Sequence, residues 1–77
     1  MKIVSICDDR DVCTGLRLAG IEGDVVYTSD EFALAFKNAF NNRQVGIVII
    51  AKGLAQRYTK QLDAVRLSRS MPLIVEL

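Results

Sequence analysis

The residues best suited to chemistry lie in one short stretch near the N-terminus, ICDDRDVCTGLRLAG. It brings together three aspartates and two cysteines: Asp8, Asp9, Asp11, Cys7 and Cys13. Carboxylates at the end of a strand can hold a divalent cation or accept a phosphoryl group, and paired thiols can bind zinc or change redox state. Each of these functions needs further ligands or reactive residues from elsewhere in the chain.

The cysteines lack partners for a metal site. The 77 residues contain two cysteines and no histidine, so they cannot supply the four ligands of a tetrahedral zinc site from Cys and His alone. A redox pair usually has two residues between its thiols, whereas Cys7 and Cys13 are farther apart. We therefore interpret both as small hydrophobic side chains that fill the core, and we expect no metal and no cofactor.

Composition and charge narrow the class of protein. Half of the residues are hydrophobic (51%), and the length suits one domain spanning residues 1–77. A net charge of +1 gives no field that would favour nucleic acid as a partner. No apolar run approaches the ~18 to 20 residues of a membrane-spanning helix, so we expect a cytoplasmic protein without direct membrane insertion.

Four short apolar runs predict strands. They are KIVSIC at 2–7, GDVVYT at 23–28, VGIVIIA at 45–51 and MPLIVEL at 71–77. The third run is apolar throughout, which is typical of a strand covered on both faces in a parallel sheet.

Helical spacing separates these runs. The first helix carries Val12, Leu16 and Ala19 on one face and should end at Gly20 in a left-handed conformation. The second should open with a capping box between Thr28 and Glu31. A third is expected over residues 54–68. The basic residues Arg57, Lys60, Arg66 and Arg69 fan around the helix instead of aligning, which favours a solvated basic flank over a contact stripe for an acidic partner.

The alternation of strands and helices predicts an α/β fold. We expect a four-stranded, mainly parallel sheet flanked by three helices, of the flavodoxin or receiver-like type with strand order 2-1-3-4. The first helix should lie on one side of the sheet and the other two on the opposite side. Asp8 and Asp9 would then lie at the switch point where such folds bind ligands.

A phosphoreceiver at this switch point needs an aspartate after the third strand. The sequence has Ala51 and Lys52 there, so the phosphoacceptor is missing. The simpler interpretation of Asp8, Asp9 and Asp11 is that they cap the first helix and interact favourably with its dipole.

Three segments resemble the F subunit of the V-type and archaeal-type rotary ATPases. They are GLRLAG at 15–20, the passage beginning at Arg43 and ending VGIVII at 45–50, and the closing PLIVEL at 72–77. The resemblance covers essentially the whole chain, and the three segments occur in the family's order and spacing.

The resemblance implies a non-catalytic rotor component of the central stalk. Such a protein binds the coiled-coil shaft, which is the D subunit, and through it connects to the catalytic head and the membrane rotor, where ATP hydrolysis or synthesis is coupled to proton or sodium transport. Family members commonly continue into a C-terminal helix, which this sequence, ending at Leu77, does not include. The alternative is a stand-alone receiver-like signalling domain without the phosphoacceptor.

A candidate partner-binding surface lies at the end of the first helix. It comprises Leu16, Arg17, Leu18 and Ile21, the last in the GIEG turn. Leu18 lies off the predicted inward stripe, so either it stays exposed for a partner or it packs under the adjacent loop. The sequence leaves both alternatives open.

Overall fold

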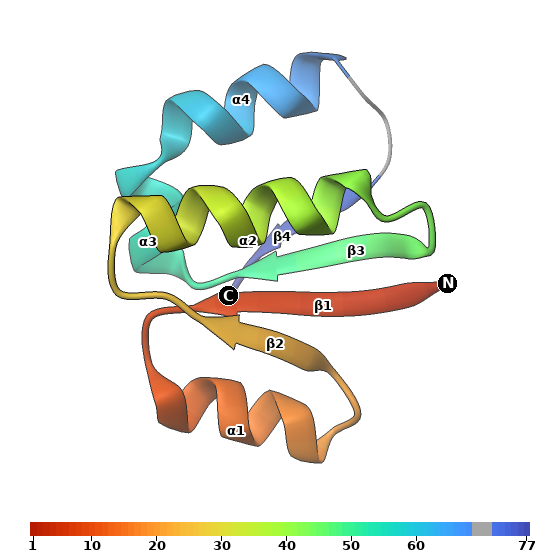
Figure 1. Cartoon of the computed structure of the whole chain (residues 1–77), viewed down its shortest axis with the longest axis vertical. Coiled ribbons are helices and arrows are strands. Elements are labelled where there is room, and N and C mark those ends of the chain that lie inside the picture. The colour runs from red at the N-terminus through yellow and green to blue at the C-terminus, as the bar shows by residue number, and fades with distance from the viewer. Residues whose placement is uncertain (69–71) are drawn as a thin grey trace.

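The structure is a computed structural model and describes residues 1–68 and 72–77. Within these residues, strands and helices follow one another along the chain (Figure 1). The elements are β1 (Lys2–Cys7), α1 (Arg10–Leu18), β2 (Glu22–Val25), α2 (Ser29–Asn41), β3 (Val45–Ile50), α3 (Lys52–Arg57), α4 (Thr59–Ser68) and β4 (Leu73–Glu76). Two residues named in the sequence predictions lie outside the described residues. They are Arg69 of the basic flank and Met71 at the start of the fourth apolar run.

The sheet has the predicted topology. Its strands are all parallel and lie in the order β2-β1-β3-β4. Helix α1 lies alone on one side of the sheet, whereas α2, α3 and α4 lie on the other (Figure 1). The α/β prediction, with its strand order and its division of helices between the two sides, is therefore confirmed.

The main core lies between the sheet and α2 to α4. Ile6, Val48 and Ile50 point into it from the central strands and are buried. Phe32 of α2 is buried beside them and stacks on Tyr58, with ring centroids 4.1 Å apart. Branched aliphatic side chains fit the pleated surface of a strand, and the aromatic rings fill the wider space under the helices.

The predicted start of α2 and end of α1 are both present. Thr28 Oγ accepts from the Glu31 N–H at 3.1 Å, and the Glu31 carboxylate accepts from the Thr28 N–H at 3.1 Å, which completes the capping box. Gly20 has φ of +89°, and its N–H donates to the Arg17 carbonyl at 2.9 Å. The Ile21 N–H donates to the Leu16 carbonyl at 2.9 Å, so α1 ends in a Schellman motif.

The predicted inward stripe of α1 needs one correction. Val12 and Leu16 are half-buried, but Ala19 is exposed, and the buried side chain of this helix is Cys13. The reason is that α1 ends at Leu18, so Ala19 is the C-cap residue and has left the regular helical path.

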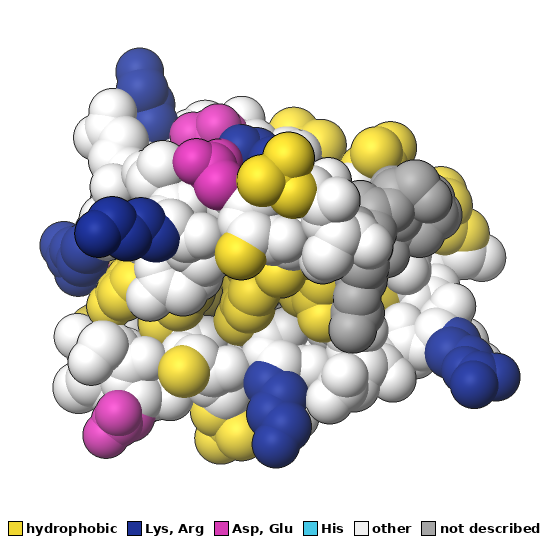
Figure 2. Space-filling model, turned by 90° about the horizontal axis from the view of Figure 1, so that it is seen from above, with side chains coloured by type: hydrophobic (Ala, Val, Ile, Leu, Met, Phe, Trp, Pro, Cys, Tyr) yellow, Lys and Arg dark blue, Asp and Glu magenta, His cyan; other side chains and the backbone are white. Residues whose placement is uncertain are grey.

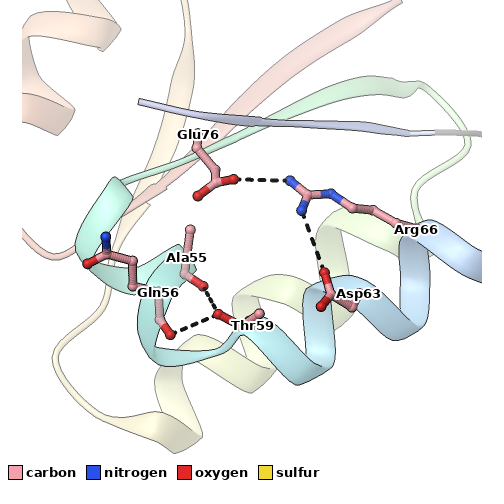
Figure 3. A network of polar contacts seen from close by, with 6 residues as sticks. All are labelled: Ala55, Gln56, Thr59, Asp63, Arg66 and Glu76. Atoms are coloured by element: carbon pink, nitrogen blue, oxygen red, sulfur yellow. Dashed lines mark hydrogen bonds and ion pairs between the residues drawn. The ribbon is translucent and has the colours of Figure 1, made fainter.

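The third predicted helix is divided at Tyr58 into α3 and α4. The Thr59 hydroxyl donates toward the carbonyl oxygens of Ala55 and Gln56, at 3.1 and 2.9 Å (Figure 3). A hydroxyl that bonds to carbonyls one turn back competes with the helical backbone bonds and favours a bend.

An ion-pair network ties α4 to β4. The Arg66 guanidinium lies 3.8 Å from the Asp63 carboxylate and 3.5 Å from the Glu76 carboxylate (Figure 3). Because these side chains are all partly exposed to solvent, the pairs contribute little free energy of folding, but they hold α4 over the edge strand.

The two faces of β3 are not equally covered. Val45, Val48 and Ile50 are buried, whereas Ile47 and Ile49 are only half-buried. The expectation that both faces of this strand are covered is therefore correct for the α2 side only. Helix α1 packs on β1 and β2, which leaves the same face of β3 and β4 without a helix among the described residues.

Candidate functional site

The acidic cluster at the carboxyl end of β1 serves mainly as a helix cap. Asp9 is the N-cap residue of α1, and its Oδ1 accepts the Asp11 N–H at 2.8 Å. Asp11 lies in the first turn, where a negative charge interacts favourably with the helix dipole. Asp8 precedes the N-cap residue, so the capping role expected of it belongs to Asp9. Asp8 is exposed and lies near the start of α3, since a Cβ placed on Gly53 would be 3.9 Å from its Oδ2.

The position opposite Asp8 carries no carboxylate. Ala51 follows β3 directly, and its N–H donates to the Ile6 carbonyl at 3.1 Å. Lys52 then begins α3. Within residues 1–68 and 72–77, no three side chains of His, Cys, Asp or Glu gather in a way that could hold a metal ion. The switch point therefore lacks the acceptor that phosphoryl transfer in a receiver requires.

The two cysteines are buried and free, between α1 and the sheet. The Cys13 thiol donates to the Asp24 carbonyl at 3.6 Å. Burial, together with the hydrogen bond and charge of the neighbouring Cys13, raises the pKa of Cys7 to about 12. A thiol with so high a pKa is almost entirely protonated at neutral pH and is a poor nucleophile. The interpretation of both residues as core-filling side chains is confirmed.

The candidate partner-binding residues lie together at the C-terminal end of α1. We call them the α1 end surface: Leu16, Arg17, Leu18 and Ile21. Leu18 is 86% exposed and Arg17 is exposed, whereas Leu16 and Ile21 are half-buried. The alternative in which Leu18 packs under the loop is therefore wrong. A leucine this exposed on the last turn of a helix contributes little to the core and is available to a partner.

An open depression adjoins the α1 end surface. It has a volume of about 380 Å³, and its lining includes Ile21, Gly20 and Ala19 on one side and Ile3 of β1 on the other. Its other lining residues are Met1, Lys2 and Glu22, so it connects the end of α1 with the amino end of the sheet.

Sequence reasoning missed a second group of apolar residues beside this depression. We call it the half-sheet face: Ile3, Ile47, Ile49, Leu73 and Val75. The strand register places Ile3, Ile47 and Leu73 side by side in one row. Ile49 lies beside Val75 in the next row on the same face of the sheet. The sequence offered no local signal for this face, because the runs at 45–51 and 73–75 are apolar at consecutive positions and suggested strands covered on both sides.

Charged side chains are scattered over the surface. Figure 2 views the molecule from the side of α4, and most of the Lys and Arg side chains visible there stand apart from one another, with hydrophobic side chains between them. In the part of the chain that the structure describes, no helix combines the length and apolar composition needed to cross a bilayer.

Comparison with known proteins decides the family. The family model described as ATP synthase (F/14-kDa) subunit matches residues 3–77. The chain belongs to this family. The match includes all three segments on which the resemblance rested, so the identification as an F subunit of the A/V-type ATPases is confirmed.

Two curated members of the family are similar over nearly the whole chain. The F subunit of the A-type ATP synthase from Methanothermobacter thermautotrophicus is 29% identical over 75 residues, which are 96% of this chain and 70% of that protein. The F subunit of the A-type ATP synthase from Thermoplasma acidophilum is 30% identical over 73 residues, 94% of this chain and 69% of that protein. Comparison with solved structures gives no match.

Proposed function

We propose that this chain is a non-catalytic component of an A-type ATP synthase that binds the coiled-coil D subunit, the shaft of the central stalk, and turns with it. In this role it supports the coupling of ATP hydrolysis or synthesis in the catalytic head to proton or sodium transport by the membrane rotor. The observation that carries the proposal is the family match over residues 3–77.

The chemistry at the carboxyl end of the sheet supports a role without catalysis. Asp9 is engaged as a helix cap, Cys7 is buried with a raised pKa, and Ala51 occupies the position of a phosphoacceptor. Family membership also favours the ATPase component over a stand-alone receiver-like signalling domain.

We assign shaft contacts to the α1 end surface. Leu18 and Arg17 are exposed on the last turn, and the Schellman motif at Gly20 fixes their position relative to Ile21. A leucine held on a rigid helix end can be buried by a partner at a low cost in conformational entropy. The protein lies in the cytoplasm, peripheral to the membrane, and reaches the membrane rotor through the shaft subunit.

Size-exclusion chromatography of this chain with the shaft subunit from the same organism tests the proposal. We expect a one-to-one complex that survives physiological salt. Failure of the wild-type chain to co-elute with the shaft subunit, at low as well as physiological salt, would overturn the proposed function.

The contribution of the α1 end surface is tested by Leu18→Glu. We expect this variant to bind the shaft subunit at least about tenfold more weakly, because an apolar contact is replaced by a charge that must lose its water. Leu67→Glu is the matched control, since Leu67 is 89% exposed on α4, on the opposite side of the sheet. If the two variants bind the shaft subunit with equal affinity, the α1 end surface is not part of the interface, but the proposed complex still stands.

A further inference from the structure

The residues of the half-sheet face all point to the side of the sheet on which α1 lies. Side chains of a strand alternate between its two faces, and paired residues of neighbouring strands point the same way. The row of Val4, Val48 and Ile74 packs into the core under α2 to α4. The alternate positions, which form the half-sheet face, therefore point to the α1 side.

The half-sheet face is exposed where α1 does not reach. Leu73 is 56% exposed, Val75 45% and Ile3 37%, and the central Ile47 and Ile49 are half-buried. Ser5, which shares a row with Ile49 and Val75, is buried. The edge strand β4 is therefore the most exposed part of this face, and on β1 only Ile3, at its amino end, is exposed.

This face carries no charge among the described residues of β1, β3 and β4. Lys2 forms its ion pair with Glu22, which lies in the row of Val4 on the other face. Glu76 shares a row with Ile6 and Ile50 and bonds to Arg66 of α4. A partner seated on the half-sheet face would bury no charge of these three strands, so an apolar partner surface complements it. Where the partner continues over the α1 end surface, it would also meet the exposed Arg17.

The area argues against a second copy of this chain as the partner. The half-sheet face consists of five side chains, each partly buried, whereas each side of a stable interface typically buries about 800 Å² with roughly 20 to 30 residues. Two such faces pressed together would fall short of that size. A partner that also covers the α1 end surface buries a larger area, because Ile3 and Ile21 line the same depression and join the two surfaces.

The shape of the face selects the kind of partner. Parallel sheets are normally covered by helices on both faces, and the gap is two strands wide, about 10 Å, which is about the diameter of one helix. We propose that the half-sheet face, continued by the α1 end surface, seats the apolar side of one amphipathic helix of the shaft subunit. This inference rests on the proposed function and specifies its interface.

Charge substitution on the edge strand tests the inference. We expect Leu73→Lys and Val75→Lys each to weaken binding of the shaft subunit at least about tenfold, because lysine must lose its water when the helix covers it. Edge strands tolerate lysine, so both variants should fold, which circular dichroism and thermal unfolding check. Leu67→Lys on α4 is the control and should bind like the wild type.

The rate of thiol labelling gives a second test, which does not require a variant that binds more weakly. With the native cysteines buried, a cysteine introduced as Val75→Cys should react rapidly with a maleimide in the free chain. In the complex we expect it to react at least about tenfold more slowly, whereas Leu67→Cys should react at the same rate in both states.

The possible outcomes separate this inference from the proposed function. If the wild type fails to bind the shaft subunit, the proposed function and this inference both fall. If the wild type binds and the edge-strand lysine variants bind equally well, only this inference is overturned. Slow labelling of Val75→Cys in the free chain would also overturn it, because the face would then be covered by a second copy or by a continuation of the chain past Leu77.

Discussion

At the scale of single residues, the cluster that most resembles an active site has structural roles. Asp9 caps α1, Asp11 lies in its first turn, and Cys7 and Cys13 fill the space beneath it. The capping role could be predicted because an aspartate directly before a helix is a local feature of the sequence. The proximity of the two thiols depends on how α1 packs on β1 and β2, which no local pattern encodes.

The raised pKa of Cys7 predicts a loss of stability in alkaline solution. Because burial raises this pKa from 9.0 to about 12, the native state holds the thiol proton over a range where the unfolded chain releases it. The free energy of unfolding contributed by this group is fully present below pH 9 and is lost as the pH rises towards 12.

Urea unfolding between about pH 7 and about pH 10.5 measures this effect against Cys7→Ala. The wild type should lose stability more steeply above pH 9 than the variant, which has no thiol at this position. Parallel slopes for the two proteins would show that the Cys7 thiol does not titrate differently in the folded and unfolded states.

At the scale of elements, most boundaries follow from local chemistry. The capping box of α2 and the glycine end of α1 were both readable from the sequence, since each depends on residues a few positions apart. The break between α3 and α4 was not predicted, because a threonine is compatible with a continuous helix and the bonds of the Thr59 hydroxyl to the Ala55 and Gln56 carbonyls are visible only in the structure. The uncovered face of β3 was missed because coverage depends on which strands α1 packs against, and its contacts with β1 and β2 are not encoded in a local pattern.

The two glycines of α1 should respond in opposite ways to alanine. Gly20→Ala should lower the free energy of unfolding by about 1 kcal/mol, since an L-residue is strained at the positive φ of this position. Gly15→Ala should raise it by roughly 0.5 to 1 kcal/mol, because Gly15 is exposed inside the helix and has open space for a Cβ. Thermal and urea unfolding of both variants check these signs, and a loss of stability in Gly15→Ala would contradict the assigned extent of α1.

At the scale of the whole molecule, part of one face of the sheet is not covered by a helix among the described residues. The described residues form one complete helical layer, α2 to α4, and a partial one, α1. The single helix on one side, α1, covers only two of four strands among the described residues. In a component of a larger complex, the missing cover can come from a partner, which links the fold of this chain to its proposed place on the shaft.

The central claim is that this chain binds the shaft subunit through an apolar surface, and calorimetric titration of the two proteins at several temperatures tests it most directly. The account predicts a one-to-one complex whose binding enthalpy becomes more favourable on warming, since burial of apolar area gives a negative heat-capacity change. The Val75→Lys variant should show a much weaker effect. Absence of binding by the wild type, or binding with no change in heat capacity, would contradict the account.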